Sequence, residues 1–328
     1  LLYSAIFGRS YCAAVCPHGA IQDIVLVKAI EVPDWLEHCL GILPFIWLGL
    51  GVLYAATGAA YIICDFDPFV ALFRLDGNAS MLGLGALFLI VGMFIGRPYC
   101  RYMCPYGVLL RLFSYVSKWQ IKIYPDRCIN CGLCDYSCPY GAIRKTTAHD
   151  STTVKKGKRQ LMMLIIIAPF FLALGGWLTS LISNQMAMGH RYVKLAHLVE
   201  QEDLQIAKGM KNIIEDERTE AFRQHPQFVG PKPTDSFKIT GKNYQERRAN
   251  LFKYASDLRH SFYIGSWALG IWVALVIIVK LIKLSIKRTR LEYEADRGSC
   301  YACGRCYEFC PGSNGVPVQA ETGSHIRE

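Results

Sequence analysis

The chain has 328 residues, of which 52% are hydrophobic and 19% are charged, and its formal net charge is +10. The charged share lies below the roughly one quarter that is usual for soluble domains, and it excludes an intrinsically disordered chain. Most basic residues stand at the ends of long uncharged runs, where they act as membrane anchors, and nothing resembles a DNA-binding motif. We therefore expect no nucleic-acid partner.

Five stretches predict transmembrane helices. A hydrocarbon core about 30 Å thick needs roughly 17–25 apolar helical residues, and four uncharged runs meet that need. The first residues of the chain have the composition of the end of a further helix, so we also expect residues upstream of them. The five stretches are 1–7, 41–63, 80–96, 161–182 and 262–279. The predicted fold class is an α-helical membrane protein with about five transmembrane helices.

Lysine and arginine predict the orientation of these helices. Basic residues cluster at one end of each of the last three apolar runs, and these ends are expected to be cytoplasmic. Tracing the chain from these anchors places residues 97–160 and 285–328 inside, and 64–79 and 183–261 outside. We expect a multi-pass protein of the bacterial inner membrane with every cysteine motif on the cytoplasmic side.

The predicted domains follow from this topology. A membrane repeat pair comes first, and the two halves of a cytoplasmic ferredoxin-like unit are separated by two transmembrane helices and a small helical extracytoplasmic domain. In chain order these segments are 1–117 (repeat pair), 118–160 (first ferredoxin half), 161–182 (transmembrane), 183–261 (extracytoplasmic), 262–284 (transmembrane) and 285–328 (cytoplasmic tail with the second half).

An internal repeat occupies the first of these domains. Residues 6–24 and 94–112 share the pattern GRxYC-x3-CPxG, with an offset of 88 residues throughout. Both copies follow a helix that enters from outside, so they are related by an axis along the membrane normal. The four cysteines of the two copies are Cys12, Cys16, Cys100 and Cys104. They predict either a third iron–sulfur centre or thiols without a cluster, and both alternatives stay open.

The loop between the second and third apolar runs holds candidate proton acceptors. Quinol oxidation releases two protons, so Asp65 and Asp67, with their aromatic neighbours, are candidates for a quinone site. The alternative is helix capping and a turn around Pro68. Cys39 and Cys64 belong to no motif, and we expect both to be small buried residues.

Two copies of the run C-x2-C-x2-C-x3-C-P begin at Cys128 and Cys300. This run binds [4Fe–4S] clusters in ferredoxins, and in two-cluster ferredoxins its fourth cysteine ligates the other cluster. By that rule the two ligand sets are Cys128, Cys131, Cys134 with Cys310, and Cys300, Cys303, Cys306 with Cys138. The alternative is that each run closes its own cluster. Zinc sites use separated pairs of ligands, and disulfides are disfavoured in the reducing cytoplasm, so we predict two [4Fe–4S] clusters.

The segment between the last two apolar runs predicts a small helical domain. Apolar residues recur at helical spacing over 191–222, and a second helical stretch covers 242–259 after a break rich in Pro and Gly. Four scattered histidines lie here, and we expect surface residues rather than haem or metal ligands: His190, His197, His225 and His260. No C-x-x-C-H sequence occurs, so no covalent haem is expected. We expect this domain to be a docking surface for an extracytoplasmic partner.

With its GRxYC-x3-CP repeats and two ferredoxin runs, the chain resembles the NosR/NapH family of membrane polyferredoxins, which includes the cytochrome oxidase assembly protein CcoG. The resemblance covers residues 1–145, and the tail motif at 300–311 in type. It implies a membrane protein with cytoplasmic clusters that exchanges electrons with quinol or with an extracytoplasmic acceptor. The flavin-binding periplasmic domain of the family is not in this sequence, and the helical hairpin between the two runs is a second departure.

These observations lead to a functional hypothesis. We expect single-electron relay between the quinone pool or a cytoplasmic donor and a partner redox protein, within a respiratory complex. The partners would be other subunits of that complex, including a flavin- or haem-containing extracytoplasmic protein. Two alternatives are a quinol dehydrogenase in its own right and a CcoG-type assembly or regulatory protein that reduces a metal or thiol. No catalytic nucleophile, phosphate-binding loop or hydride-cofactor motif is present.

Overall fold

The computed structural model describes residues 2–59, 63, 67–68, 79–123, 128–147, 151–207, 244–286, 290 and 292–311. Apart from one short two-stranded sheet, the regular secondary structure of these residues is helical. In chain order the elements are α1 (Leu2–Phe7), α2 (Ser10–Ala14), α3 (Pro17–Val25), α4 (Asp34–Leu40), α5 (Leu43–Ala56), α8 (Ala79–Gly92), α9 (Pro98–Tyr102), α10 (Pro105–Ser114), α11 (Leu133–Tyr136), β1 (Ile143–Arg144), α12 (Ser151–Leu181), α13 (Ser183–Ala187), α14 (Arg191–Ala207), α17 (Tyr244–Ser285), β2 (Glu294–Ala295) and α18 (Arg305–Glu308).

Three helical segments in the described part are long and apolar enough to cross a membrane. They are Asp34–Ala56, Arg159–Leu181 and Arg248–Ser285. The fourth predicted span is shorter than expected, because α8 has 14 residues and ends at Gly92. At 1.5 Å per residue such a helix is about 21 Å long, less than the roughly 30 Å of a hydrocarbon core. The described residues therefore support an α-helical membrane protein with three clear candidate spans.

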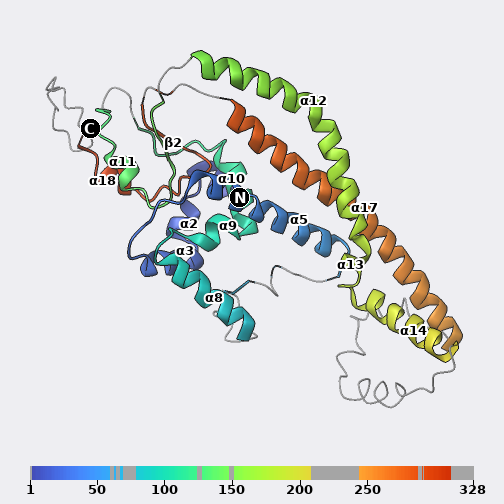
Figure 1. Ribbon diagram of the computed structural model, residues 1–328. Coiled ribbons are helices and arrows are strands. Elements are labelled where there is room, and N and C mark those ends of the chain that lie inside the picture. Colours follow the sequence, from blue (N-terminus) through green and yellow to red (C-terminus); the bar gives the residue numbers. More distant parts are fainter. Residues whose placement is uncertain are drawn as a thin grey trace. The chain divides into compact units, whose positions relative to one another are not determined.

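The long helix α17 differs from the prediction. The stretch 242–259 was predicted to belong to a separate outer domain and 262–279 to be a membrane span, whereas both lie in one helix of 42 residues, Tyr244–Ser285. The reason is local, because no proline and no glycine pair interrupts the sequence between the two stretches. A boundary at residue 261 thus falls inside a continuous helix (Figure 1).

The chain divides into two compact units. One of them consists of Gly49–Ile63 and Ile167–Leu275. Its core joins α13 and α14 to the first half of α17, with Val193 and Phe262 fully buried. Within this unit α12 approaches α17 closely, because a Cβ on Gly270 would lie 2.1 Å from the backbone oxygen of Gly175. Small residues of this kind allow apolar helices to pack backbone against backbone.

The other unit consists of Leu1–Leu48, Cys64–Ile166 and Val276–Glu328, and it contains every cysteine motif. The two repeat copies fold alike, as α2 followed by α3 and as α9 followed by α10. In each copy the second cysteine has an extended backbone and precedes a helix that starts with proline. Proline suits this position because its fixed φ fits the first helical turn and its missing N–H is not needed there.

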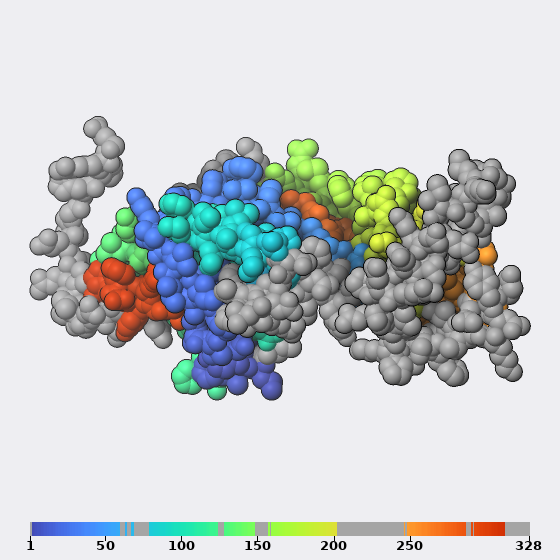
Figure 2. Space-filling view, turned by 90° about the horizontal axis from the view of Figure 1, so that it is seen from below, coloured from blue at the N-terminus to red at the C-terminus, as the bar shows by residue number. Residues whose placement is uncertain are grey.

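The same unit brings together the two ferredoxin runs. Strands β1 and β2 pair antiparallel, with Ile143 opposite Ala295 and Arg144 opposite Glu294. Helices α11 and α18, one from each run, lie side by side (Figure 1). The space-filling view shows the C-terminal segment in red beside the N-terminal residues in blue (Figure 2). The prediction that the two runs meet, although 161 residues separate them, is therefore confirmed.

Candidate metal centres

Four cysteines from the two ferredoxin runs line one cavity, which we call the ferredoxin pocket. They are Cys138 from the first run and Cys300, Cys303 and Cys306 from the second. This is one of the two ligand sets that the inter-run rule predicts. In the described part of the chain, no three His, Cys, Asp or Glu side chains converge in the manner of a single-ion site.

The two ferredoxin runs share a backbone conformation. The third and fifth residues of both runs adopt the left-handed conformation, with φ of 55° and 76° at Asn130 and Gly132, and of 55° and 83° at Ala302 and Gly304. For a residue with a Cβ, such as Ala302, this conformation costs about 1–2 kcal/mol. Two runs far apart in sequence thus form the same tight loop.

The thiols of the ferredoxin pocket affect one another's ionisation. Burial raises the pKa of Cys306 to about 11, and the neighbouring Cys300, Cys138 and Cys303 contribute in the same direction. Four thiolates in this space therefore need a positively charged group among them. Iron–sulfur cores are held by cysteine thiolates, so the donor set fits such a group.

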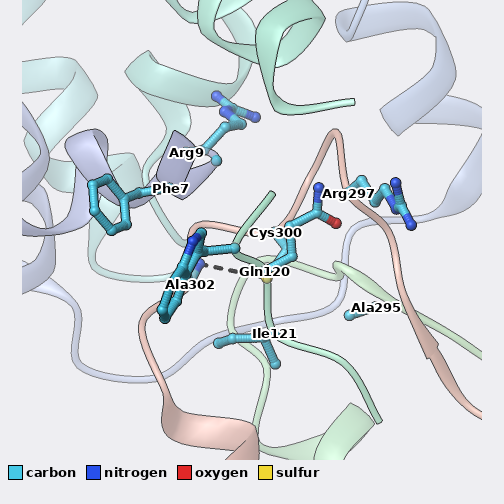
Figure 3. Close-up of a pocket in the computed structure, with 10 residues that line it drawn as sticks. Phe7, Arg9, Gln120, Ile121, Ala295, Arg297, Cys300 and Ala302 are labelled. Carbon is cyan, nitrogen blue, oxygen red and sulfur yellow. Dashed lines mark hydrogen bonds between the residues drawn. The ribbon is translucent and has the colours of Figure 1, made fainter. Parts of the chain in front are cut away.

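Backbone amides donate to two of these sulfurs. The N–H of Ala302 donates to Cys300 Sγ at 3.4 Å, and the N–H of Ala142 donates to Cys138 Sγ at 3.4 Å. Figure 3 shows the first of these bonds beside a small pocket, with Phe7 and Arg9 on one side of it and Ile121 on the other. Hydrogen bonds to sulfur are among the factors that set cluster potentials.

The remaining cysteines of the first run form a second group. Burial raises the pKa of Cys134, and the neighbouring Cys128 and Cys131 raise it further. The three thiols therefore lie near one another. Cys131 is exposed, and Cys134 and Cys310 are partly buried. The assignment of Cys310 to this group stays a prediction.

The four repeat cysteines also lie near one another, and we call them the repeat centre. Burial raises the pKa of Cys100, and its neighbours Cys104, Cys12 and Cys16 raise it further. Burial raises the pKa of Cys104 to about 11, although backbone N–H groups of Gly107 and Tyr106 act against this rise. The two repeat copies thus meet, and four buried or half-buried thiols at one place form a donor set that fits an iron–sulfur core.

The repeat arginines, which the sequence analysis used only to align the two copies, are buried beside these cysteines. The side chain of Arg97 is fully buried and pairs with Asp23 through two hydrogen bonds, and its Nη1 donates to the carbonyl oxygen of Cys12 at 3.0 Å. Arg9 donates to the carbonyl oxygen of Gly298 at 2.9 Å and to the hydroxyl of Tyr301 at 3.1 Å. In both copies the arginine stands three residues before the first cysteine, and this recurrence was the available signal for its role.

Two tyrosines from the ferredoxin runs link the ferredoxin pocket to the repeat centre. The rings of Tyr140 and Tyr301 meet edge to face, 4.9 Å apart, and each is 2% exposed. Both pack in one cluster with Cys12 of the repeat centre and Cys138 of the pocket. The guanidinium of Arg9 lies 4.3 Å from the Tyr301 ring centre. The two cysteine sites are thus joined through aromatic and cationic side chains.

A glutamine of the first repeat copy contacts a cysteine of the second. Gln22 is fully buried, and its Nε2 donates to Cys100 Sγ at 3.2 Å while its Oε1 accepts from the backbone N–H of Tyr99 at 3.0 Å. Periodicity gave no sign of this role, because a glutamine on an amphipathic helix is expected to face solvent.

The candidate proton acceptors are only partly described. Asp65 lies outside the described residues. The predicted topology puts Asp67 and Cys100 at opposite ends of the apolar run 80–96. In the structure, Asp67 instead lies beside Tyr99, the residue before Cys100. Burial and the Asp67 carboxylate both raise the pKa of Tyr99. The same carboxylate acts on His18, whose pKa is lowered by burial despite it.

Other predicted positions can be placed individually. Cys39 was expected to be buried, but it is exposed on the apolar segment Asp34–Ala56, whose surface is open to the surroundings rather than packed. Cys64 and His225 lie outside the described residues. His190 was expected at the surface, and this is wrong: it is buried against the rings of Tyr192 and Tyr254, and its Nδ1 accepts from the backbone N–H of Tyr192. His197 is partly buried and His260 is exposed.

Comparison with known protein families adds to this geometry. A family described as a 4Fe-4S binding domain matches residues 1–33 and 78–123, which contain the repeat cysteines, and a second family of the same description matches residues 121–144. The chain thus carries iron–sulfur binding domains over both the repeat pair and the first ferredoxin run. No solved structure matches.

Several curated proteins are similar over part of the chain. The putative electron transport protein YccM of Escherichia coli is 27% identical over 151 residues, covering 41% of this chain and 42% of its own. The methylamine utilization ferredoxin-type protein MauN of Paracoccus denitrificans is 28% identical, covering 41% and 49%. The regulatory protein NosR of Pseudomonas aeruginosa is 28% identical, covering 34% and 18%. Over these residues the chain is similar to membrane polyferredoxins of the NosR/NapH-like kind, and the resemblance seen in the sequence is confirmed.

The matches span about half the length, or less, of the relatives just described. The family matches cover the repeat pair and the first ferredoxin run, while the second run at Cys300 is connected to them by the geometry of the ferredoxin pocket.

Proposed function

We propose that this polyferredoxin relays single electrons through three iron–sulfur centres. The observation that carries the proposal is the packing of Tyr140 and Tyr301 in one cluster with Cys12 of the repeat centre and Cys138 of the ferredoxin pocket. Iron–sulfur clusters supply one-electron redox chemistry over a wide range of potentials when bound. The chain provides thiolate ligands, amide donors to sulfur and burial from water. The relative YccM is named a putative electron transport protein, which agrees with this role.

The proposed ligand sets follow the two sites. Cys138, Cys300, Cys303 and Cys306 would hold one cluster, and Cys128, Cys131 and Cys134 would hold another together with Cys310. The repeat centre would hold the third. Its support is electrostatic as well as geometric, because Arg9 and Arg97 bring two buried positive charges and Asp23 offers one negative charge. Buried charges are costly unless they are balanced, and a core bound by four thiolates carries net negative charge.

The proposed setting is the bacterial inner membrane, with the clusters on the cytoplasmic side. The support is the basic residues that flank two of the candidate spans, at Arg159 and after Ser285. We further propose that electrons pass between the quinone pool or a cytoplasmic donor and a partner redox protein of a respiratory complex. The helices α13 and α14, packed on α17, offer a surface for that partner.

The proposed proton acceptor at a quinone site is Asp67. Its support is its position beside Tyr99 and close to His18, which gives three groups able to exchange protons next to Cys100. The variant Asp67→Asn should slow reduction of the clusters by a short-chain quinol at least tenfold while leaving reduction by dithionite unchanged. Equal rates for Asp67→Asn and the parent protein with quinol would remove Asp67 from this role.

The number of centres is tested by metal content. Iron and acid-labile sulfide are measured on anaerobically purified protein, where three [4Fe–4S] clusters predict about 12 Fe per chain. The double variant Cys12→Ser/Cys104→Ser should lose about four of them, as should Cys138→Ser/Cys306→Ser. The matched control is Cys39→Ser, an exposed cysteine outside every motif, which should lose none. About eight Fe in the parent chain, with no loss in the repeat variant, would refute the third centre.

A further inference from the structure

The two repeat arginines occupy equivalent positions but differ in charge balance. Arg97 pairs with the carboxylate of Asp23. The residue that matches Asp23 in the second copy, 88 positions later, is Arg111, so the repeat supplies no carboxylate for Arg9. The internal symmetry of the backbone is therefore broken in its electrostatics.

Arg9 is held by neutral oxygens. Its guanidinium donates to the carbonyl of Gly298 and the hydroxyl of Tyr301, and its buried Nε has no hydrogen-bond partner in the described structure. The side chain is held in place on both sides, yet nothing among these contacts is a carboxylate. Arg9 is 6% exposed, so water does little to screen its charge.

Tyr301 and three thiols of the repeat centre stabilise the charged form of Arg9. Burial lowers the pKa of Arg9, and Tyr301, Cys12, Cys100 and Cys104 outweigh that effect and raise it. A Cβ added to Gly107 would lie 3.5 Å from Arg9 Nη2 and 3.7 Å from Cys104 Cβ, so the guanidinium lies beside a cysteine of the repeat centre. Negative charge on that centre would therefore act on Arg9 at short range. Adding an electron to that centre makes it more negative, and a fixed positive charge nearby stabilises the more negative state.

We propose that Arg9 sets the reduction potential of the repeat centre, because its charge, unlike that of Arg97, is not cancelled by a carboxylate and so favours the reduced state. The inference rests on the proposed third cluster. It assigns different roles to two residues that the sequence pattern makes equivalent: Arg97 with Asp23 is a neutral structural pair, and Arg9 is a charge directed at the cysteines.

The test is a redox titration followed by EPR, in which the repeat-centre signal is the component that disappears in Cys12→Ser/Cys104→Ser. Arg9→Gln should lower the midpoint potential of the repeat centre. We expect the ratio of reduced to oxidised centre at a fixed potential to fall at least tenfold, which for one electron is a shift of about 59 mV. Arg9→Lys keeps the charge and should restore most of the shift. The matched control Arg97→Gln/Asp23→Asn removes the other guanidinium together with its carboxylate, and should shift the ratio less than threefold.

The outcomes separate this inference from the proposed function. Iron content that is unchanged in Cys12→Ser/Cys104→Ser would overturn the third cluster and the Arg9 proposal together. Loss of iron in that variant, with equal potentials for Arg9→Gln and the parent protein, would overturn the Arg9 proposal alone. Equal shifts in Arg9→Gln and the Arg97→Gln/Asp23→Asn control would also overturn it. If Arg9→Gln fails to bind iron, Arg9→Lys is compared with the parent protein instead. A tenfold fall in the ratio of reduced to oxidised centre in Arg9→Lys, which keeps the positive charge, would contradict a charge effect.

Discussion

The two repeat copies provide a matched pair of glycines whose replacement should have very different consequences. Gly19 and Gly107 occupy equivalent positions, two residues after the Cys-Pro bond that starts α3 and α10. A Cβ on Gly19 would lie 2.2 Å from the carbonyl oxygen of Cys12, whereas a Cβ on Gly107 would lie 3.2 Å from the carbonyl oxygen of Cys100. The first distance is impossible without movement, and the second needs a displacement of a few tenths of an ångström.

The magnitude follows from what has to move. The obstructing atom at Gly19 is backbone, and the same carbonyl accepts from Arg97 Nη1 at 3.0 Å, so relief requires breaking a buried contact. Inserting a group into a packed interior costs about 1–3 kcal/mol, and occasionally more. Gly19→Ala should reach the upper end of that range. Gly107→Ala should stay below about 1 kcal/mol, because the helix preference of alanine over glycine offsets the mild crowding.

Two measurements on the purified protein in detergent test this. Thermal stability is monitored by the loss of cluster absorbance on heating, and iron content is measured separately at 4 °C. The lower temperature preserves bound iron, so content and thermal stability are read separately. We expect the apparent Tm of Gly19→Ala to fall several degrees further than that of Gly107→Ala, with iron lost from the repeat centre first. Equal Tm values for the two variants would refute the reasoning, because the geometric difference is all that distinguishes them.

Three further substitutions test other contacts. Asp23→Asn leaves the buried Arg97 charge without its partner, which should cost about 3–5 kcal/mol. Tyr140→Phe removes the neutral hydroxyl that donates to Asp23 at 3.0 Å and should cost only about 1 kcal/mol; urea unfolding of the two variants side by side checks the order. Gly270→Leu should separate α12 from α17 at Gly175, since even a Cβ would lie 2.1 Å from a backbone oxygen there. A cysteine cross-link between the two helices that still forms at the parent rate would contradict that expectation.

The sequence predicted the parts of this molecule that depend on spacing. Of the two ligand arrangements that the ferredoxin runs allowed, the structure groups Cys138 with Cys300, Cys303 and Cys306 in one pocket. The repeat pattern singled out Cys12, Cys16, Cys100 and Cys104 as one set, because motif spacing can be read directly from the sequence. Apolar runs predicted membrane helices for the same reason, because length and absence of charge are local properties.

Other features depend on tertiary contacts that leave no periodic signal. Burial of Gln22 against Cys100 Sγ cannot be deduced from an amphipathic helix. The continuity of α17 through residue 261 was missed because a change from polar to apolar composition was taken for a domain boundary. The difference between Arg9 and Arg97 needs the position of Asp23, which lies on another helix.

The pairing of β1 with β2 has a consequence for biogenesis. Cys138 reaches its partners only after the chain has continued through α12 and α17 to residue 306. Closing so long a loop adds little to the free-energy cost but makes the contact late and slow to form. The ferredoxin pocket therefore cannot be complete on a ribosome-bound fragment that ends before α18. Its completion marks a chain whose two long apolar helices have already been synthesised, so the cluster proposed for this pocket would be acquired only after both helices are made.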